Sequence, residues 1–237
     1  MNLHHPKAVL FDLDRTLTNR PASIMKYTGS FLTEYKNKLL PHLDIDQLSF
    51  VLNKADGGGY NHLNRSPHII SSLNWITPPS PDELDEHWKS NFPKSAVFAD
   101  QAYDLLLALR DTGVRTAIVT NGSSRAQNAK IDALGIREIV ELILISEEVR
   151  IEKPDKKIFK LALAQLELDA KHCLFIGDHP VNDIIGAHLT GMRTVWISEG
   201  RSWEEQDIEP TWIVESVSIL PNLFLNHKIT SKAAIKS

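Results

Sequence analysis

Residues 8–17 read AVLFDLDRTL, a short apolar run that ends abruptly in two carboxylates. The four apolar residues from Ala8 to Phe11 suit a strand buried on both faces, although so short a run also fits a buried helix. On an extended chain, residues two apart point the same way, so Asp12 and Asp14 would face one space and repel each other unless a cation or a proton lies between them. The pattern favours a metal site or acid and base chemistry over a simple turn after the strand.

The composition is that of an ordinary globular chain with one large domain or two modest ones. Of the 237 residues, 42% are hydrophobic and 24% are charged, which is ample material for a core. The formal charge of -4 and the lack of a dense Lys/Arg stripe before the C-terminal tail predict no nucleic-acid partner. The single Cys173 cannot form an internal disulfide, and neither a signal peptide nor an apolar run of about 20 residues is evident. We therefore expect a cytoplasmic protein that does not enter membranes, and the sequence carries no signal for its oligomeric state.

The segment from residue 19 to residue 95 has a helical pattern and no evident strand. Apolar residues recur there at spacings of three and four, and Ser, Asp, Pro and Gly stand where helices begin or end. We expect helices at 23–39, from Asp44 to the triple glycine at 57–59, at 66–76 and at 83–91.

From residue 100 onward, helices alternate with short apolar runs. Such alternation is typical of crossover connections between parallel strands covered on both faces, so the expected fold class is α/β. The expected strands are 116–119, 142–145, 174–176 and 194–197, with a last edge strand at 212–214 before a short helix. The expected helices between them are 103–110, 124–134, 155–166 and 182–189.

Polar residues follow these strands at the points where the strands end. Asp12 follows the first strand, Thr120 and Asn121 end the second, and Asp178 follows the fourth, while Lys153 comes shortly after the third. Ligands of open parallel sheets bind beyond the carboxyl ends of the strands. Carboxylates suit Mg²⁺, and lysine, hydroxyl and amide groups suit a phosphate. Each motif alone is more often a turn or a helix cap, but together they predict a site for magnesium and a phosphate.

The four motifs, in this order and spacing, resemble those of the haloacid dehalogenase-like hydrolase superfamily. The resemblance covers residues 7–18 and 96–220, and its motifs are 12–16, 120–122, 153–154 and 177–183. It implies a Rossmann-like hydrolase core made of residues 1–18 and 96–225, a small all-helical cap domain of the first type at 19–95, and a flexible tail at 226–237. A cap of this kind would close over the site, exclude water and select the substrate.

The resemblance also implies catalytic roles for the first two carboxylates. Asp12 would be the nucleophile and would form an aspartyl-phosphate intermediate. Asp14 would protonate the leaving oxygen and later activate the water, so it must hold a proton part of the time.

The same resemblance implies the phosphate and metal ligands. Thr120 and Lys153 would bind the transferring phosphoryl group, with the backbone at Asn121 helping. Asp183 would lie behind the metal and orient its waters or the lysine. The implied Mg²⁺ ligands are Asp12, the backbone carbonyl of Asp14, and Asp178.

Two residues depart from the common pattern of the family. Arg15 stands where many members have glycine, and it either points into the cap or solvent or contacts the substrate. His179 follows the metal-binding Asp178, and we expect it only to line the site.

Asp14 discriminates between the reactions that the superfamily performs, because members that displace halide lack an acid at that place. We therefore expect a Mg²⁺-dependent phosphatase that acts on a small phosphorylated metabolite such as a sugar phosphate, a nucleotide or a phosphoglycolate-like compound. A phosphomutase would keep the same carboxylates, and a non-catalytic binding scaffold is a third possibility. Several cap side chains form a mixture that suits a phosphorylated sugar or nucleotide, although side chains of this kind are more often packing than substrate contacts: Tyr60, His62, Arg65, His68, Trp75 and Trp88.

Overall fold

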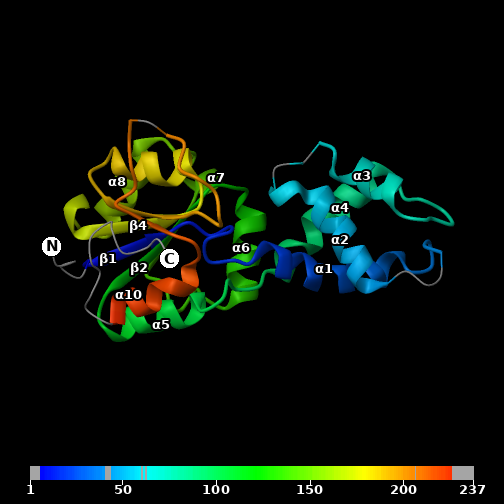
Figure 1. Ribbon diagram of the computed structural model, residues 1–237, viewed down its shortest axis with the longest axis horizontal. Helices are drawn as coiled ribbons and strands as arrows, with labels where there is room; N and C mark the ends of the chain where they lie inside the picture. Colours follow the sequence, from blue (N-terminus) through cyan, green and yellow to red (C-terminus); the bar gives the residue numbers. More distant parts are fainter. Residues whose placement is uncertain (1–5, 41–43, 60, 62, 206, 226–237) are drawn as a thin grey trace.

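The computed structural model describes residues 6–40, 44–59, 61, 63–205 and 207–225, which form two lobes (Figure 1). The tail predicted at 226–237 and the cap residues Tyr60 and His62 lie outside the described residues. No helix in the described part of the chain is long and apolar enough to cross a membrane.

A six-stranded parallel sheet forms the larger lobe, in the order β3-β2-β1-β4-β5-β6. The strands are β1 (Ala8–Phe11), β2 (Arg115–Thr120), β3 (Leu142–Ile145), β4 (Cys173–Gly177), β5 (Arg193–Ile197) and β6 (Trp212–Val214). β1 is central, between β2 and β4, and the strand order reverses beside it. This reversal is where open α/β sheets bind ligands, and it places Asp12 there.

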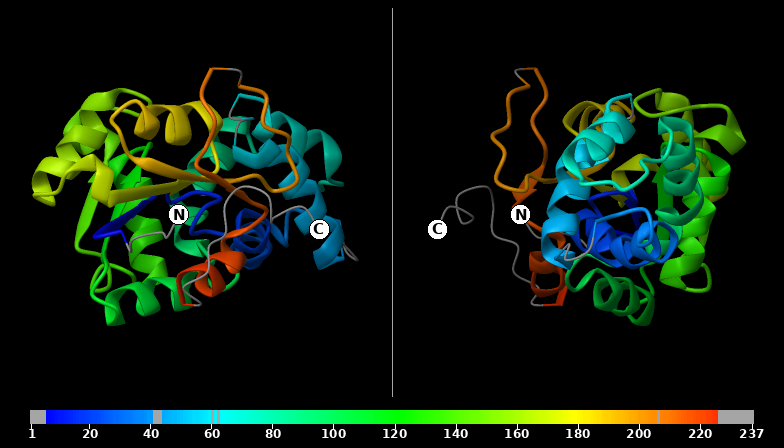
Figure 2. Two further views of the ribbon diagram at one scale, coloured as in Figure 1. Left: turned by 60° about the vertical axis from the view of Figure 1, so that its left-hand side comes forward. Right: turned by 90° about the vertical axis from the view of Figure 1, so that its right-hand side faces the viewer.

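Helices cover both faces of the sheet, which confirms the expected α/β class (Figures 1 and 2). Side chains of β1 alternate between the faces, as the pleat requires. Val9 and Phe11 pack in an apolar cluster with α5 (Ala102–Asp111), α6 (Ser124–Leu134) and α10 (Leu220–Leu225). Ala8 and Leu10 pack in another with α8 (Lys156–Gln165) and α9 (Gly186–His188).

The helix expected at 182–189 is wrong in its form and in its start. Residues Pro180–Ile185 form a π-helical turn that begins directly after His179, and only Gly186–His188 continue as the α-helix α9. The wider turn brings Asp183 back under the end of β4. A Cβ atom on Gly177 would lie 2.4 Å from an oxygen of Asp183, so glycine is required for this approach.

The described residues of the smaller lobe form the helices α1 (Arg20–Tyr35), α2 (Ile45–Asp56), α3 (Arg65–Ser72) and α4 (Pro81–Asn91), with 3₁₀ turns at Gly57–Gly59 and Pro93–Ser95 and an isolated antiparallel bridge between Leu39 and Trp75. They pack around one apolar cluster that includes Tyr27, Phe31, Leu48 and Trp88. Two of them begin earlier than the apolar spacing predicts because side chains cap them. Asn19 accepts a hydrogen bond from the Ala22 N–H, and Ser80 forms a capping box with Glu83.

Two neighbouring stretches of chain connect the lobes. Thr18 and Phe98 form an antiparallel bridge, the Asn19 N–H donates to the Val97 carbonyl, and the Ala99 N–H donates to the Leu17 carbonyl. The first stretch leaves β1 within a few residues of Asp12. The helical lobe is therefore held beside the end of the central strand, and its function as a cap remains a prediction.

Candidate active site

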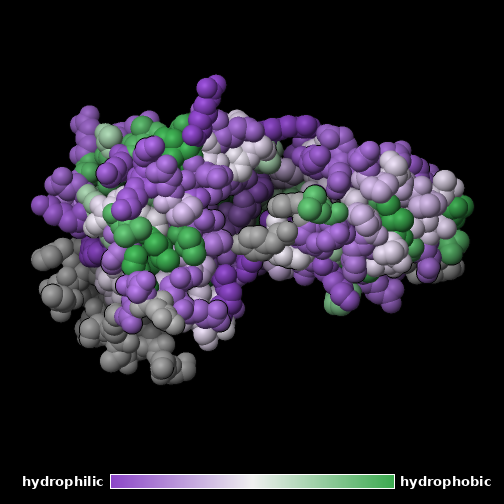
Figure 3. Space-filling model, turned by 90° about the horizontal axis from the view of Figure 1, so that it is seen from above, coloured by the Kyte–Doolittle hydropathy of each residue, from purple (hydrophilic) through white to green (hydrophobic). Residues whose placement is uncertain are grey.

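A cavity of about 950 Å³ lies between the carboxyl edge of the sheet and the helical lobe. In the space-filling view the two lobes meet at a narrow waist (Figure 3). Each residue that the sequence proposed for the site lines this cavity, namely Asp12, Asp14, Thr120, Asn121, Lys153, Asp178 and Asp183. The structure therefore brings the four motifs together on one wall, opposite side chains of the helical lobe.

Lys153 lies at the centre of the wall and is almost fully buried, with 3% of its surface exposed. Its Nζ donates hydrogen bonds of 2.6 Å to Asp12 Oδ1 and to Asp183 Oδ1. Burial alone would lower the pKa of Lys153, but the charges of the two carboxylates outweigh it, so the pKa is raised above its usual 10.5. The lysine therefore stays charged at every pH at which an enzyme is normally assayed.

The side chain of Asn121 holds the backbone of Lys153. Its Oδ1 accepts a hydrogen bond from the Lys153 N–H and its Nδ2 donates one to the Lys153 carbonyl, both at 2.8 Å. The amide thus positions the lysine. The predicted contact between Asn121 and a phosphate would therefore have to come from the backbone N–H of Asn121, as the family resemblance implies.

Three buried carboxylates converge beside this lysine. One oxygen from each of Asp12, Asp178 and Asp183 lies within 4.8 Å of the others. Burial and the neighbouring carboxylates raise the pKa of Asp12 well above its usual 3.8, against the lowering effect of Lys153. Burial, followed by the charge of Asp183, raises the pKa of Asp178 to about 7. Arg15 and Arg201 also lie near Asp178, at 3.5 and 3.3 Å from its Oδ2, yet the pKa values of Asp12 and Asp178 stay raised.

This donor set fits a divalent cation. Hard carboxylate oxygens are the ligands that Mg²⁺ prefers, and a cation would relieve the repulsion that raises both pKa values. The sequence places Asp183 behind the metal. In the structure, one of its carboxylate oxygens lies within 4.8 Å of oxygens of both Asp12 and Asp178. The carboxylate of Asp14 turns away from the three acids, and the backbone carbonyl of Asp14 as a ligand remains a prediction.

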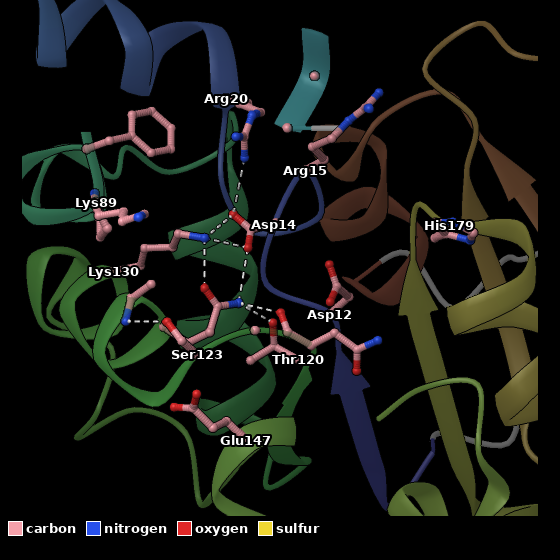
Figure 4. A pocket seen from close by; sticks show the side chains of 18 of the residues that line it. Asp12, Asp14, Arg15, Arg20, Lys89, Thr120, Ser123, Lys130, Glu147 and His179 are labelled. Carbon is pink, nitrogen blue, oxygen red and sulfur yellow. Dashed lines mark hydrogen bonds and ion pairs between the residues drawn. The ribbon is translucent and has the colours of Figure 1, made fainter. Parts of the chain in front are cut away.

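Asp14 is bound by a lysine that the sequence reasoning missed. Lys130 Nζ lies 2.7 and 2.6 Å from the two carboxylate oxygens of Asp14, and Gln127 Nε2 donates to Oδ2 at 3.1 Å (Figure 4). Arg20 of the helical lobe adds a longer ion pair at 3.9 Å. Burial raises the pKa of Asp14, but Lys130 and Arg20 outweigh it and the pKa lies below its usual value. Here Asp14 is ionised, whereas the acid role requires a proton.

Gln127 also orients Thr120. Its Nε2 donates a 2.5 Å hydrogen bond to Thr120 Oγ1, so that oxygen acts as an acceptor and its own hydrogen is left to donate. Thr120 ends β2 and is buried, so this hydroxyl has one fixed direction in which to act. The sequence held one signal for Gln127 and Lys130. Residues 127 and 130 share one face of the helix that begins just after Thr120, so both side chains can reach the same site.

The structure shows that Arg15 does not point into the helical lobe, and its contact with a substrate remains a prediction. Its φ is 61°, and its guanidinium forms an ion pair with Glu199 and lies 3.5 Å from Asp178. The side chain therefore stays on the core side, where it also lines the cavity. His179 lines the cavity too, and its Nδ1 accepts a hydrogen bond from the Asn182 N–H.

Comparisons with known proteins agree with this arrangement. The family model described as haloacid dehalogenase-like hydrolase matches residues 9–197. Pyrimidine 5'-nucleotidase of Escherichia coli (strain K12) is 34% identical over 62% of this chain and 65% of its own length. Ribulose-1,5-bisphosphate 5-phosphatase of Halopiger xanaduensis is 32% identical over 79% of this chain and 83% of its own. Phosphoserine phosphatase of Thermus thermophilus is 34% identical, but the match spans only 45% of its length.

Solved structures show the same fold. A magnesium-bound putative HAD-hydrolase from Bacillus subtilis has a TM-score of 0.69, with 92% of this chain and 98% of that chain covered at 22% identity. The family match runs from the central strand to β5 and takes in each of the four motifs that meet at the cavity. On that match, the chain belongs to the haloacid dehalogenase-like hydrolases.

Proposed function

We propose that this protein is a Mg²⁺-dependent phosphatase that hydrolyses a small phosphomonoester through an aspartyl-phosphate on Asp12. The observation that carries the proposal is the buried cluster in which Lys153 binds Asp12 while Asp14 lines the same cavity. Figure 4 shows Asp12 and Asp14 at this cavity. Curated relatives named as phosphatases of ribulose bisphosphate, phosphoserine and glyceraldehyde 3-phosphate, and a relative named as a pyrimidine 5'-nucleotidase, support the reaction class.

The nucleophile is oriented by the lysine. Lys153 binds Oδ1 of Asp12, and among the described residues none donates a hydrogen bond to Oδ2. Oδ2 is thus the oxygen with a lone pair directed at a phosphorus atom. The Thr120 hydroxyl and the Lys153 ammonium would bind the phosphoryl oxygens, because phosphoryl transfer depends chiefly on positioning and on charge neutralisation. When bound at Asp12, Asp178 and the Asp14 carbonyl, Mg²⁺ would add to that neutralisation.

Asp14 has to change its protonation state between the two half-reactions. The ionised form held by Lys130 suits the second one, in which a carboxylate takes a proton from the attacking water. For the first, Asp14 must arrive protonated. A dianionic phosphate in the cavity would compete for Lys130 and Arg20 and would add repulsion, and both effects raise the pKa of Asp14. Substrate binding itself would then prepare the acid.

The test is the release of inorganic phosphate, measured with Mg²⁺ and with a chelator. The panel combines p-nitrophenyl phosphate with sugar phosphates, nucleotides and phosphoglycolate. We expect turnover that requires Mg²⁺ and that differs among the esters. Movement of phosphate to another hydroxyl of the sugar without net release would indicate a mutase. Absence of both reactions, from folded protein that binds Mg²⁺, would leave a binding scaffold.

Magnesium affinity should increase as the pH rises through about 7. Asp178, with its pKa raised to about 7, holds a proton below that pH in the metal-free protein, and Mg²⁺ must displace it. Each pH unit below the pKa should therefore weaken binding by about tenfold for this one proton. Calorimetric titration with Mg²⁺ at about pH 6 and pH 8 measures the difference. Equal affinities at both pH values would contradict the prediction.

The stability of the metal-free protein should show the opposite trend. Between 3.8 and about 7 the folded protein holds a proton on Asp178 that the unfolded chain has lost. The free energy of unfolding therefore falls as the pH rises through this range, and Mg²⁺ binding offsets the fall. In Asp178→Asn this contribution to the pH dependence should disappear.

A further inference from the structure

Arg65 is a buried cation on the side of the cavity that belongs to the helical lobe. It begins α3, lines the same cavity as Asp12, and is 5% exposed. Its guanidinium carbon lies 4.4 Å from the ring centroid of Trp88 in α4. A planar guanidinium packed on an aromatic face keeps its orientation, so its N–H groups point in fixed directions.

The donors of Arg65 are largely unused. A guanidinium has five N–H donors, and among the described residues none accepts a hydrogen bond from this one within 3.5 Å. Its Nε is buried and has no hydrogen-bond partner among the residues that the structure describes. Buried donors in folded proteins are almost always paired, so this one calls for an explanation, such as a group that the protein binds.

Two carboxylates lie near Arg65, but other groups already bind them. Asp56 Oδ1 is 3.8 Å from Arg65 and accepts a 2.9 Å hydrogen bond from Arg20, which also binds Oδ2 of the same carboxylate. Asp85 Oδ1 is 3.7 Å from Arg65 and accepts a 2.6 Å hydrogen bond from the Ser66 hydroxyl. Both acids balance part of the charge of Arg65 without occupying its N–H groups.

Two further cations reach the cavity from the same lobe, Arg20 of α1 and Lys89 of α4. Lys89 follows Trp88 and is exposed (Figure 4). In the part of the chain that the structure describes, Lys89 has no ion pair. Asp85 is the one described acid of this lobe that lines the cavity, against three described cations of the same lobe. This wall therefore favours a negative ligand.

We propose that Arg65 binds a second anionic group of the substrate, a carboxylate or a second phosphate, on the part of the molecule that remains after phosphate is released. The preferred substrates are then phosphomonoesters that carry such a group. A planar fork of donors pairs in a bidentate manner with both kinds of anion. The inference rests on the proposed function, because it concerns which ester the same cavity accepts.

The experiment compares substrates that differ by one charged group. Phosphoglycolate is paired with ethyl phosphate to test a carboxylate, and propanediol bisphosphate is paired with propyl phosphate to test a second phosphate. The measured quantity is the ratio of kcat/KM within each pair, for the native protein and for Arg65→Met. We expect a ratio above one in the native protein for at least one pair. Arg65→Met should lower that ratio by about 10- to 100-fold, chiefly through KM.

Two controls make the ratio interpretable. Arg110→Met removes an exposed arginine from the other lobe and should leave the ratio at the native value. Arg65→Lys keeps the charge but loses the planar pair of N–H donors. Its kcat/KM ratio should lie between the ratios of the native protein and of Arg65→Met. Asp56 and Asp85 retain Arg20 and Ser66 as partners in these variants, so we expect them to fold, and circular dichroism checks this.

The outcomes separate this inference from the proposed function. A purely structural Arg65 would lower kcat/KM for both members of a pair alike and leave the ratio unchanged, which overturns the inference. A native protein that hydrolyses p-nitrophenyl phosphate but shows no preference within either pair also overturns it, while the phosphatase stands. No turnover of any ester would instead remove the proposed function on which the inference rests.

Discussion

Asp12→Asn should reduce phosphate release by about 10⁴-fold or more, to the level of the chelated native protein. The amide is close to the carboxylate in shape, and its carbonyl oxygen can still accept the hydrogen bond that Lys153 donates to Oδ1. It lacks the nucleophilic oxygen that would form the aspartyl-phosphate. The measurement is turnover of p-nitrophenyl phosphate, joined to an acid-quench experiment in which radiolabelled substrate marks the native chain and not the variant.

The same substitution should not destabilise the metal-free protein. The pKa of Asp12 is raised by burial and by its acidic neighbours, so above that pKa the ionised form opposes folding. A neutral amide relieves this cost, and we expect an unfolding free energy equal to or above the native value at about pH 8. Asp104→Asn, on the exposed side of α5, is the matched control and should keep full activity. Substantial activity in folded Asp12→Asn would contradict a nucleophilic role for this residue.

The sequence predicts the core well because the signals there are local. Each strand of the sheet is a short apolar run, and each begins and ends within a residue or two of the predicted bounds. The parallel arrangement then forces the strand ends onto one edge, so the meeting of Asp12, Thr120, Lys153 and Asp178 follows from topology alone.

What the sequence does not predict depends on contacts between distant segments. Lys130 and Gln127 look like ordinary polar positions of an amphipathic helix until the fold places them on Asp14, which is more than a hundred residues earlier in the chain. The π-helical turn after His179 likewise has no periodic pattern of its own. It accompanies the close approach of Asp183 to Gly177, two residues that local periodicity does not connect.

The lobes are linked by charge at the site itself. Arg20, at the start of α1, binds both oxygens of Asp56 and lies 3.9 Å from Asp14, which in turn binds Lys130 of the core. A movement of the helical lobe relative to the core would therefore change the charges that act on Asp14. The helical lobe, for which substrate selection is a prediction, would then also take part in setting when Asp14 is protonated.

Lys153→Met should have the largest effect on stability. Methionine has nearly the length of lysine but no charge, and it would remove the ion-pair partner that Asp12 and Asp183 share, while Arg15 and Arg201 would remain beside Asp178. Removing one partner of a buried ion pair typically costs about 3–5 kcal/mol. We expect a loss of that size in the free energy of unfolding of the metal-free protein, measured by urea denaturation at about pH 8.

Two further measurements distinguish this electrostatic cause from a simple packing defect. Adding Mg²⁺ should narrow the difference in the free energy of unfolding between Lys153→Met and the native protein, because a bound cation neutralises part of the charge of the carboxylates. Lowering the pH toward about 5 should also narrow this difference in the free energy of unfolding, since Asp12 and Asp178, whose pKa values are raised, then bind protons and the repulsion falls. Lys157→Met, on the exposed side of α8, is the matched control. It should change neither the free energy of unfolding nor its response to Mg²⁺ and pH.

Phosphate release by Lys153→Met should fall by about 10²- to 10³-fold even where added Mg²⁺ restores the fold. The ammonium orients Asp12 and would neutralise the phosphoryl oxygens as they gain charge, and a metal held by Asp12 and Asp178 would not replace that hydrogen-bond donor. If Lys153→Met had the native free energy of unfolding both with and without Mg²⁺, the three carboxylates could not form a cluster whose charge Lys153 neutralises. If stability fell while activity per folded molecule stayed native, Lys153 would support the structure alone and Thr120 would be left as the main phosphate ligand.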